Sequence, residues 1–159
     1  QIPLLAINLF NLILPSSTDF FSFCLVRNDD FIFGLPDDTY ETMNKTLEMA
    51  METNFEYVDF YTCMAYPGSP LYLESVSKGS RLPDQWHGYS QLGTETLPLP
   101  TKTLTGKQVL QFRDEAFIKY FRNPAYLKRI NDRFGKDAVD HINHMLEINL
   151  YRKVLDNAA

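Results

Sequence analysis

The stretch that decides the fold is "FIFGLPDDTYETMNKTLEMAMETNFEYVDFYTCM", residues 31–64. It opens with a short apolar and aromatic run that is typical of a buried strand. Behind it, four apolar residues recur at the spacing of one helix face, namely Met43, Leu47, Ala50 and Met51. Residues 55–64 are again rich in aromatic and β-branched residues. Strand, helix and strand in this order predict a βαβ unit, whose strands pair in parallel through a right-handed crossover.

The turn after the first strand is the first candidate site. Gly34 would allow a ligand or a neighbouring backbone to approach closely, and Pro36 would set the direction in which the chain leaves the strand. Asp38 and Glu41 predict a capping box, and the first helical turn would offer free N–H groups. A tight turn without any ligand explains the same residues.

The loop after the second strand is the other candidate site. Tyr66, Pro67 and Gly68 form a stiff segment with one aromatic ring that could stack on a planar ligand. A plain turn is an equal alternative. Because the carboxyl ends of parallel strands meet at one edge of a sheet, we expect both loops to line one crevice.

The rest of the chain divides into three parts. Residues 76–104 predict a long polar connection, and residues 105–159 a helical extension. Within the extension we expect three helices: one capped by Thr105 and Gln108, one from Asn123 and Pro124 to near Gly135, and one over residues 137–156. Residues 1–29 show no clean period and are left unassigned.

The net charge, the cysteine count and the length of the apolar segment each argue against one class of protein. The 159 residues carry a net charge of −5, so no basic surface for nucleic acid is expected. The only cysteines, Cys24 and Cys63, are too few for a disulfide framework, which favours a cytoplasmic location. The apolar residues 1–15 fall short of a membrane span.

A few other polar residues have spacings that could indicate a site. His141, His144 and Glu147 follow at intervals of three on one predicted helix, but a polar helix face explains them without a metal. Arg113 and Asp114 are expected to form an ordinary ion pair. No catalytic residue and no metal ligand is predicted from the sequence.

Three ordered blocks together resemble a known family. They are "FIFGLPDDTYETMNKTLEMA", "YVDFYTCMAYPGSPLY" and "LPLPTKTLTGKQVLQFRDEAFIKYFRNPAYLKRINDRFG". This combination is similar to the C-terminal half of radical S-adenosylmethionine enzymes, of the type with a cobalamin-binding domain. The resemblance implies part of a TIM-type (β/α) barrel over residues 30–75, followed by the helical extension. It also implies a small-molecule substrate, hydrogen abstraction by a 5′-deoxyadenosyl radical and, in many members, methyl transfer.

The resemblance also implies contacts with S-adenosylmethionine. In the family's GxIxGxxE motif, Ile32 takes the apolar position, Gly34 the second glycine and Asp37 the acidic position, with Pro36 in the same loop. Asp30 stands where the first glycine is expected. The loop with Tyr66, Pro67 and Gly68 is similar to the family's loop after the sixth strand, near the cofactor.

The departures from the family concern its other cofactors. No CxxxCxxC motif occurs, so a [4Fe–4S] cluster and cobalamin would have to come from upstream parts. Residues 1–29 do not match the family either. We therefore interpret the chain as a C-terminal fragment that is inactive by itself. The alternative is a non-catalytic helical module that presents Phe117, Tyr120 and Phe121 to a partner protein.

Overall fold

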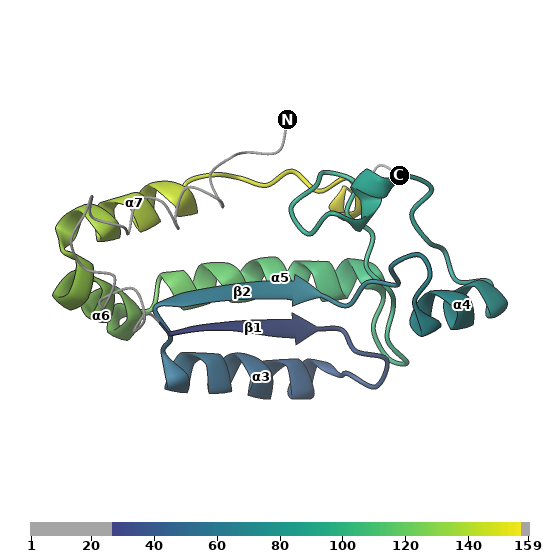
Figure 1. The fold of residues 1–159 in the computed structure, drawn as a ribbon, viewed down its shortest axis with the longest axis horizontal. Coiled ribbons are helices and arrows are strands. Elements are labelled where there is room, and N and C mark those ends of the chain that lie inside the picture. The colour runs from purple at the N-terminus through teal and green to yellow at the C-terminus, as the bar shows by residue number, and fades with distance from the viewer. Residues whose placement is uncertain (1–26, 157–159) are drawn as a thin grey trace.

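The computed structural model describes residues 27–156 (Figure 1). The expectations for residues 1–29 therefore lie, up to residue 26, outside the described part of the chain, as does Cys24. None of the described helices is long and apolar enough to cross a membrane.

The predicted βαβ unit is present. Strand β1 (Asn28–Phe33) and strand β2 (Tyr57–Thr62) form a two-stranded parallel sheet, and helix α3 (Tyr40–Thr53) connects them. Asn28 pairs with Tyr57 and Phe33 with Thr62 at the two ends of the register. Both arrowheads point toward α4 in Figure 1, so the loops after the two strands leave from the same edge.

The start of α3 differs from the sequence prediction. Thr39, rather than Asp38, is the N-cap, and it forms a capping box with Thr42, whose N–H donates to Thr39 Oγ1 at 3.3 Å. The predicted box of Asp38 and Glu41 was wrong because the Asp38 carboxylate bonds elsewhere. It accepts hydrogen bonds from the N–H groups of Gly34 and Leu35.

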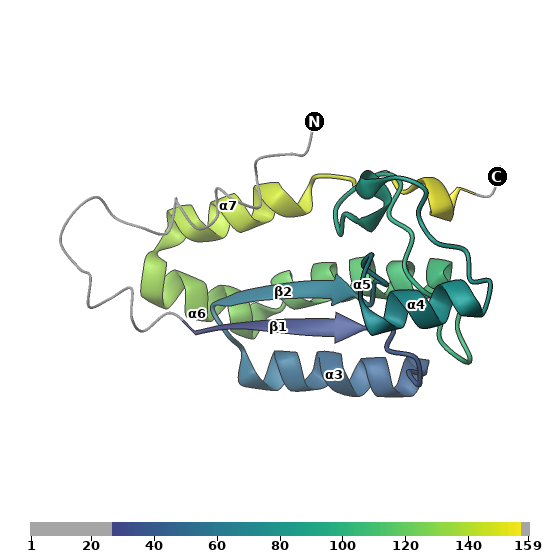
Figure 2. The ribbon, with the colours of Figure 1, turned by 45° about the vertical axis from the view of Figure 1, so that its right-hand side comes forward.

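The core lies on one face of the sheet. Phe31, Phe33 and Phe60 point into it, and α3 and helix α5 (Gly106–Phe121) both contribute to the same cluster. Phe33 meets Phe112 of α5 edge-on, with ring centroids 5.0 Å apart. The structure is thus a mixed α/β arrangement in which the two helices cover the same face of a parallel strand pair (Figure 2).

The region predicted as connection, and the segment before it, contain helices. Helix α4 (Pro70–Ser77) begins at Ser69, whose Oγ accepts from the N–H of Tyr72, and the 3₁₀ helix η1 (Trp86–Tyr89) follows. The "SP" pair at residues 69–70 is a cap followed by proline at the first helical position. These two residues in the sequence are therefore the signal for the start of α4.

The C-terminal extension contains fewer helical residues than predicted. Helix α6 (Pro124–Phe134) is capped by Gly135, as expected. Helix α7 (Lys136–Leu146) ends ten residues before Asp156, the last described residue. Among the described residues, only the 3₁₀ helix η2 (Lys153–Leu155) follows it. The physical reason is Arg152. Its side chain is buried and bonded to Asp114 of α5, which holds the chain after α7 in an extended path back to that helix.

The alternative of a partner-binding helical face is wrong for two of its three residues. Tyr120 is fully buried and Phe121 is 2% exposed, because both pack in the core against the sheet and α6. Only Phe117 is partly accessible. The rings of Tyr120 and Phe121 hold α5 to the rest of the molecule and are not available to a partner.

Candidate functional site at the carboxyl ends of the strands

The two candidate loops start side by side. The N–H of Cys63 donates to Phe33 O at 2.8 Å, which extends the parallel ladder by one bond beyond β2. Gly34 follows β1 directly, and Tyr66 comes three residues after Cys63. Both loops therefore leave the same edge of the sheet, and the expectation that they line one crevice stays a prediction.

Gly34 is required by packing. Its φ of +81° favours glycine, and a Cβ atom there would lie 2.4 Å from Val109 Cγ1 of α5. The close neighbour of Gly34 is thus a side chain of this chain. The glycine allows α5 to approach the end of β1, which leaves the adenosyl contact assigned to Gly34 as a proposal only.

The Asp38 carboxylate organises the turn between β1 and α3. One oxygen accepts from the N–H groups of Gly34 and Leu35 at 3.0 and 2.9 Å, and the other accepts from Thr42 Oγ1 at 2.7 Å. In the predicted first helical turn itself, the N–H of Asp38 donates to Leu35 O and the N–H of Thr39 donates to Thr42 Oγ1, so fewer free N–H groups remain there than the sequence suggested. Pro36 O accepts from the N–H of Lys102, which ties the turn to the end of the connecting segment, just before the C-terminal extension.

The remaining atoms of this turn face solvent. Pro36 is exposed, and Asp37 forms an exposed ion pair with Lys102. Ile32, the last even-numbered residue of β1, is 47% exposed on the side of the sheet away from the core. Of the residues assigned to the first loop, Ile32 offers the accessible apolar surface that an adenine ring requires.

The second loop lies against an aromatic group that sequence reasoning did not connect to it. Tyr66 is 47% exposed, and its ring centroid lies 5.9 Å from that of Tyr89. Tyr89 in turn lies 5.9 Å from Trp86, which is largely exposed. Pro67 and Gly68 are exposed, and Gly68 has a φ of +87° with open space around it. The exposed rings of Tyr66 and Trp86, on either side of the buried Tyr89, offer a stacking surface beside the carboxyl end of β2.

The face of the sheet that no helix of residues 27–156 covers carries polar and acidic residues. Asp30 pairs in register with Asp59, and Ile32 with Tyr61, while the alternate residues Phe31, Phe33, Val58 and Phe60 point to the core. The alternation of buried and accessible residues along "YVDFYT" was visible in the sequence. It did not identify a site there, because only the position of the helices decides which face stays open.

The pKa values of three residues on this face, Asp30, Tyr57 and Tyr61, are raised, which is expected where carboxylates lie close together. Partial burial, then Asp59 and Asp29, raise the pKa of the Asp30 carboxyl. Burial and the Asp59 carboxylate raise the pKa of Tyr57 and Tyr61 to about 12, so both phenols stay protonated at neutral pH. The face therefore presents carboxylates beside neutral phenols.

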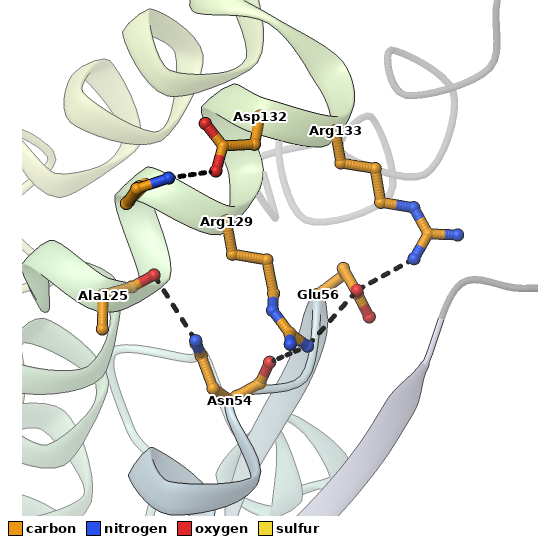
Figure 3. Close-up of a pocket in the computed structure, with 7 residues that line it drawn as sticks. Asn54, Glu56, Ala125, Arg129, Asp132 and Arg133 are labelled. Carbon is orange, nitrogen blue, oxygen red and sulfur yellow. Dashed lines mark hydrogen bonds and ion pairs between the residues drawn. The ribbon is translucent and has the colours of Figure 1, made fainter.

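A hollow of about 480 Å³ lies at the opposite end of the strands (Figure 3). Glu56, which is 4% exposed, accepts from Arg133 at 2.9 Å and lies 3.5 Å from Arg129. Arg129 also donates to Asn54 O at 2.8 Å. Because these charges pair with one another and ligands of parallel α/β units bind at the carboxyl ends, we interpret this hollow as a structural clamp between β2 and α6.

The described residues, 27–156, do not fit an iron–sulfur cluster. Cys63 is the one cysteine among residues 27–156, and burial raises the pKa of its thiol, whereas cluster ligands are thiolates. His144 lies 3.4 Å from Glu147 on α7, and within the described range no three His, Cys, Asp or Glu side chains are placed to hold a metal.

Comparison with known proteins gives one distant relative. The chain is 26% identical over 97 residues to an uncharacterized methyltransferase of Pyrococcus horikoshii, a match that covers 61% of this chain and 20% of the relative. The chain thus spans about a fifth of the curated relative that it matches. No family model and no solved structure matches. The comparisons therefore indicate a distant relationship to a protein named as a methyltransferase.

Proposed function

We propose that this chain is part of an S-adenosylmethionine-dependent methyltransferase of the radical type, and that the loops after β1 and β2 form the adenosyl side of its cofactor site. The observation that carries the proposal is the pair of parallel strands with α3 and α5 on one face. In (β/α) barrels all helices lie outside, and the active site lies at the carboxyl ends of the strands. The relative's printed name supports the reaction class.

The side chains of the two loops have different roles in this proposal. Ile32 provides the apolar contact for the adenine ring, and Tyr66 provides a stacking surface. Gly34 and Asp38 keep the first loop in shape through the contact with Val109 and the bonds to backbone N–H groups. Bound S-adenosylmethionine supplies the methyl or adenosyl group for the reaction. No step is assigned to a cluster or to cobalamin, because residues that would hold them are not in the described part of the chain.

Binding of S-adenosylmethionine tests the proposed site directly. Equilibrium dialysis of the full chain with labelled S-adenosylmethionine should detect binding that Ile32→Asp and Tyr66→Ala each weaken by about tenfold, the equivalent of about 1.4 kcal/mol. Tyr151→Ala is the matched control, since Tyr151 is also an exposed aromatic residue but bonds to Asp156 in the C-terminal stretch. Equal affinity in all four proteins would contradict the assignment.

The radical reaction needs a separate assay. The chain is joined to an upstream half that carries a CxxxCxxC motif, loaded with iron and sulfide, and reduced without oxygen. Formation of 5′-deoxyadenosine is the expected result. A cluster-loaded protein that binds S-adenosylmethionine and releases no 5′-deoxyadenosine would retain the cofactor site and exclude the radical mechanism.

A further inference from the structure

A short segment of the chain touches both of the loops that follow the strands. The chain that leads into α5 passes the carboxyl ends of β1 and β2 (Figure 1). The N–H of Leu99 donates to Cys63 O at 3.3 Å, just before the second loop. The N–H of Lys102 donates to Pro36 O at 2.9 Å, within the first loop. These contacts define residues 99–103 as a bridging segment between the two loops.

A third hydrogen bond joins the bridging segment to the first loop. Thr103 Oγ1 donates to Asp38 O at 3.2 Å, and its other contact, with Thr101 Oγ1 at 3.5 Å, stays within the segment. Asp38 is the residue whose carboxylate accepts from the N–H groups of Gly34 and Leu35. The bridging segment therefore contacts the residue that sets the shape of the first loop.

The bridging segment is itself stiff. A proline on each side of Leu99 fixes the backbone there. Thr101 Oγ1 accepts from the N–H of Thr103 at 3.1 Å and from the N–H of Leu104 at 2.9 Å. The side chains of Leu99 and Leu104 are both buried, so the segment is anchored at its two ends. A stiff and anchored segment can hold both loops in fixed positions.

Beyond the sheet, the two loops are not bonded directly to each other. The ladder between the strands ends with the bond from the N–H of Cys63 to Phe33 O. Within the part of the chain that the structure describes, no hydrogen bond joins residues 34–38 to residues 64–68. The spacing of the loops therefore depends on packing and on the bridging segment.

We propose that the bridging segment is a positioning element for S-adenosylmethionine, because it sets the distance between Ile32 at the first loop and Tyr66 in the second. A ligand that contacts both residues then binds without first having to order the loops. Such preorganisation raises affinity by lowering the entropy that binding costs. The inference rests on the proposed function, since S-adenosylmethionine is the ligand that spans the two loops there.

The hydroxyl group of Thr103 provides the first test. Thr103→Val replaces the donor with a methyl group of similar size, whereas Thr103→Ser retains the hydroxyl. Equilibrium dialysis of the full chain with labelled S-adenosylmethionine should show affinity lowered about three- to tenfold in Thr103→Val, the equivalent of one lost hydrogen bond, and nearly unchanged in Thr103→Ser. Thr46→Val is the matched control, because the Thr46 hydroxyl bonds to Thr42 O within α3.

The backbone of the bridging segment provides a second test. Lys102→Pro removes the N–H that donates to Pro36 O, whereas Lys102→Ala retains this N–H and removes only the side chain that pairs with Asp37. Lys102→Pro should therefore weaken binding more than Lys102→Ala does. Circular dichroism at the temperature of the binding assay verifies that each variant is folded. A purely structural role would lower the melting temperature and leave the affinity of the folded protein unchanged.

The outcomes separate this inference from the proposed function. If the unchanged chain binds S-adenosylmethionine and the folded Thr103→Val and Lys102→Pro variants bind it equally well, the inference is overturned and the proposed site remains. A loss in Thr46→Val as large as that in Thr103→Val would also overturn the inference. Absence of binding by the unchanged chain would contradict the proposed function, and the inference with it.

Discussion

At the scale of single residues, glycine is required for two different reasons. At one position a side chain would clash with a neighbour, and at another only the backbone conformation favours glycine. Gly34 and Gly68 both have positive φ and both follow a strand of the sheet. Only Gly34 has a neighbour, Val109, within reach of a Cβ atom. Two positions that look alike in the sequence therefore have different reasons to be glycine.

The two glycines form a matched pair of substitutions. Gly34→Ala should cost about 2 to 4 kcal/mol of stability, because it adds a clash with Val109 to the backbone strain. Gly68→Ala should cost about 1 to 2 kcal/mol, from the strain alone. Urea denaturation measures both, and equal costs would contradict a packing role for Gly34.

Asp30 predicts a pH dependence of stability. Because its pKa is raised in the folded protein, the folded state binds the proton more readily than the unfolded state. This contribution is therefore present at low pH and is lost as the pH rises through the folded pKa. Asp30→Asn should stabilise the protein more at pH 7 than at pH 3, as measured by thermal unfolding at both values. A gain that is the same at both pH values would contradict the raised pKa.

At the scale of elements, the outer edge of β2 is closed by side chains. The side-chain oxygen of Gln91 accepts from the N–H of Thr62 at 2.9 Å, and its amide donates to Thr62 O at 3.0 Å. Arg113 donates to Phe60 O two residues earlier. An exposed strand edge invites pairing with another chain, so these two side chains protect β2 from a further strand.

Loss of the Gln91 bonds should be costly. Gln91→Leu leaves the buried N–H and carbonyl of Thr62 without partners, which should destabilise the protein by roughly 1 to 3 kcal/mol. Gln111→Leu is the control, since Gln111 bonds only to Glu115 on the exposed side of α5 and its loss should lie within about 0.5 kcal/mol of zero. Chemical denaturation of both variants compares them. A Gln91→Leu protein as stable as its control would show that the edge is satisfied in another way.

At the scale of the whole molecule, Glu56 connects the sheet to the C-terminal helices. It accepts from the N–H of Arg27 before β1 and from Arg133 of α6, so one carboxylate joins three segments. Tyr126 of α6 donates to Glu56 O at 3.2 Å and adds a buried bond to the same joint. The position of α6, and with it α7, depends on this joint.

Neutralising Glu56 should loosen α6 before the rest of the fold. Glu56→Gln should cost about 1 to 2 kcal/mol and speed amide hydrogen exchange in α6 more than in α3, because the charged bonds to the partly exposed arginines weaken. Asp132→Asn, which removes an exposed pair on the same helix, should leave exchange nearly unchanged. Uniform acceleration in α3 and α6 would argue against a local joint.

The sequence by itself determined most of the local elements, although not helix α4 or the end of α7. The apolar spacing in residues 40–53 required a helix face, the aromatic runs before and after it required strands, and Thr105 with Gln108 and Asn123 with Pro124 set the helix starts found in the structure. These signals depend on neighbours a few residues apart. Parallel pairing followed from the order of the elements, since a helix between two strands allows little else.

Only the tertiary structure decided which face and which charges remain free. Three features depend on contacts between residues that are 38 or more positions apart, such as Arg152 with Asp114. They are the face of the sheet on which Asp59 lies, the packing of Gly34 against Val109, and the residue at which α7 ends. The physical reason is that the spacing of apolar residues along the sequence indicates only whether a segment is a helix or a strand. Which residue each apolar side chain contacts depends on how the elements pack together in three dimensions. The open face of β1 and β2 exists because α3 and α5 both cover the other one.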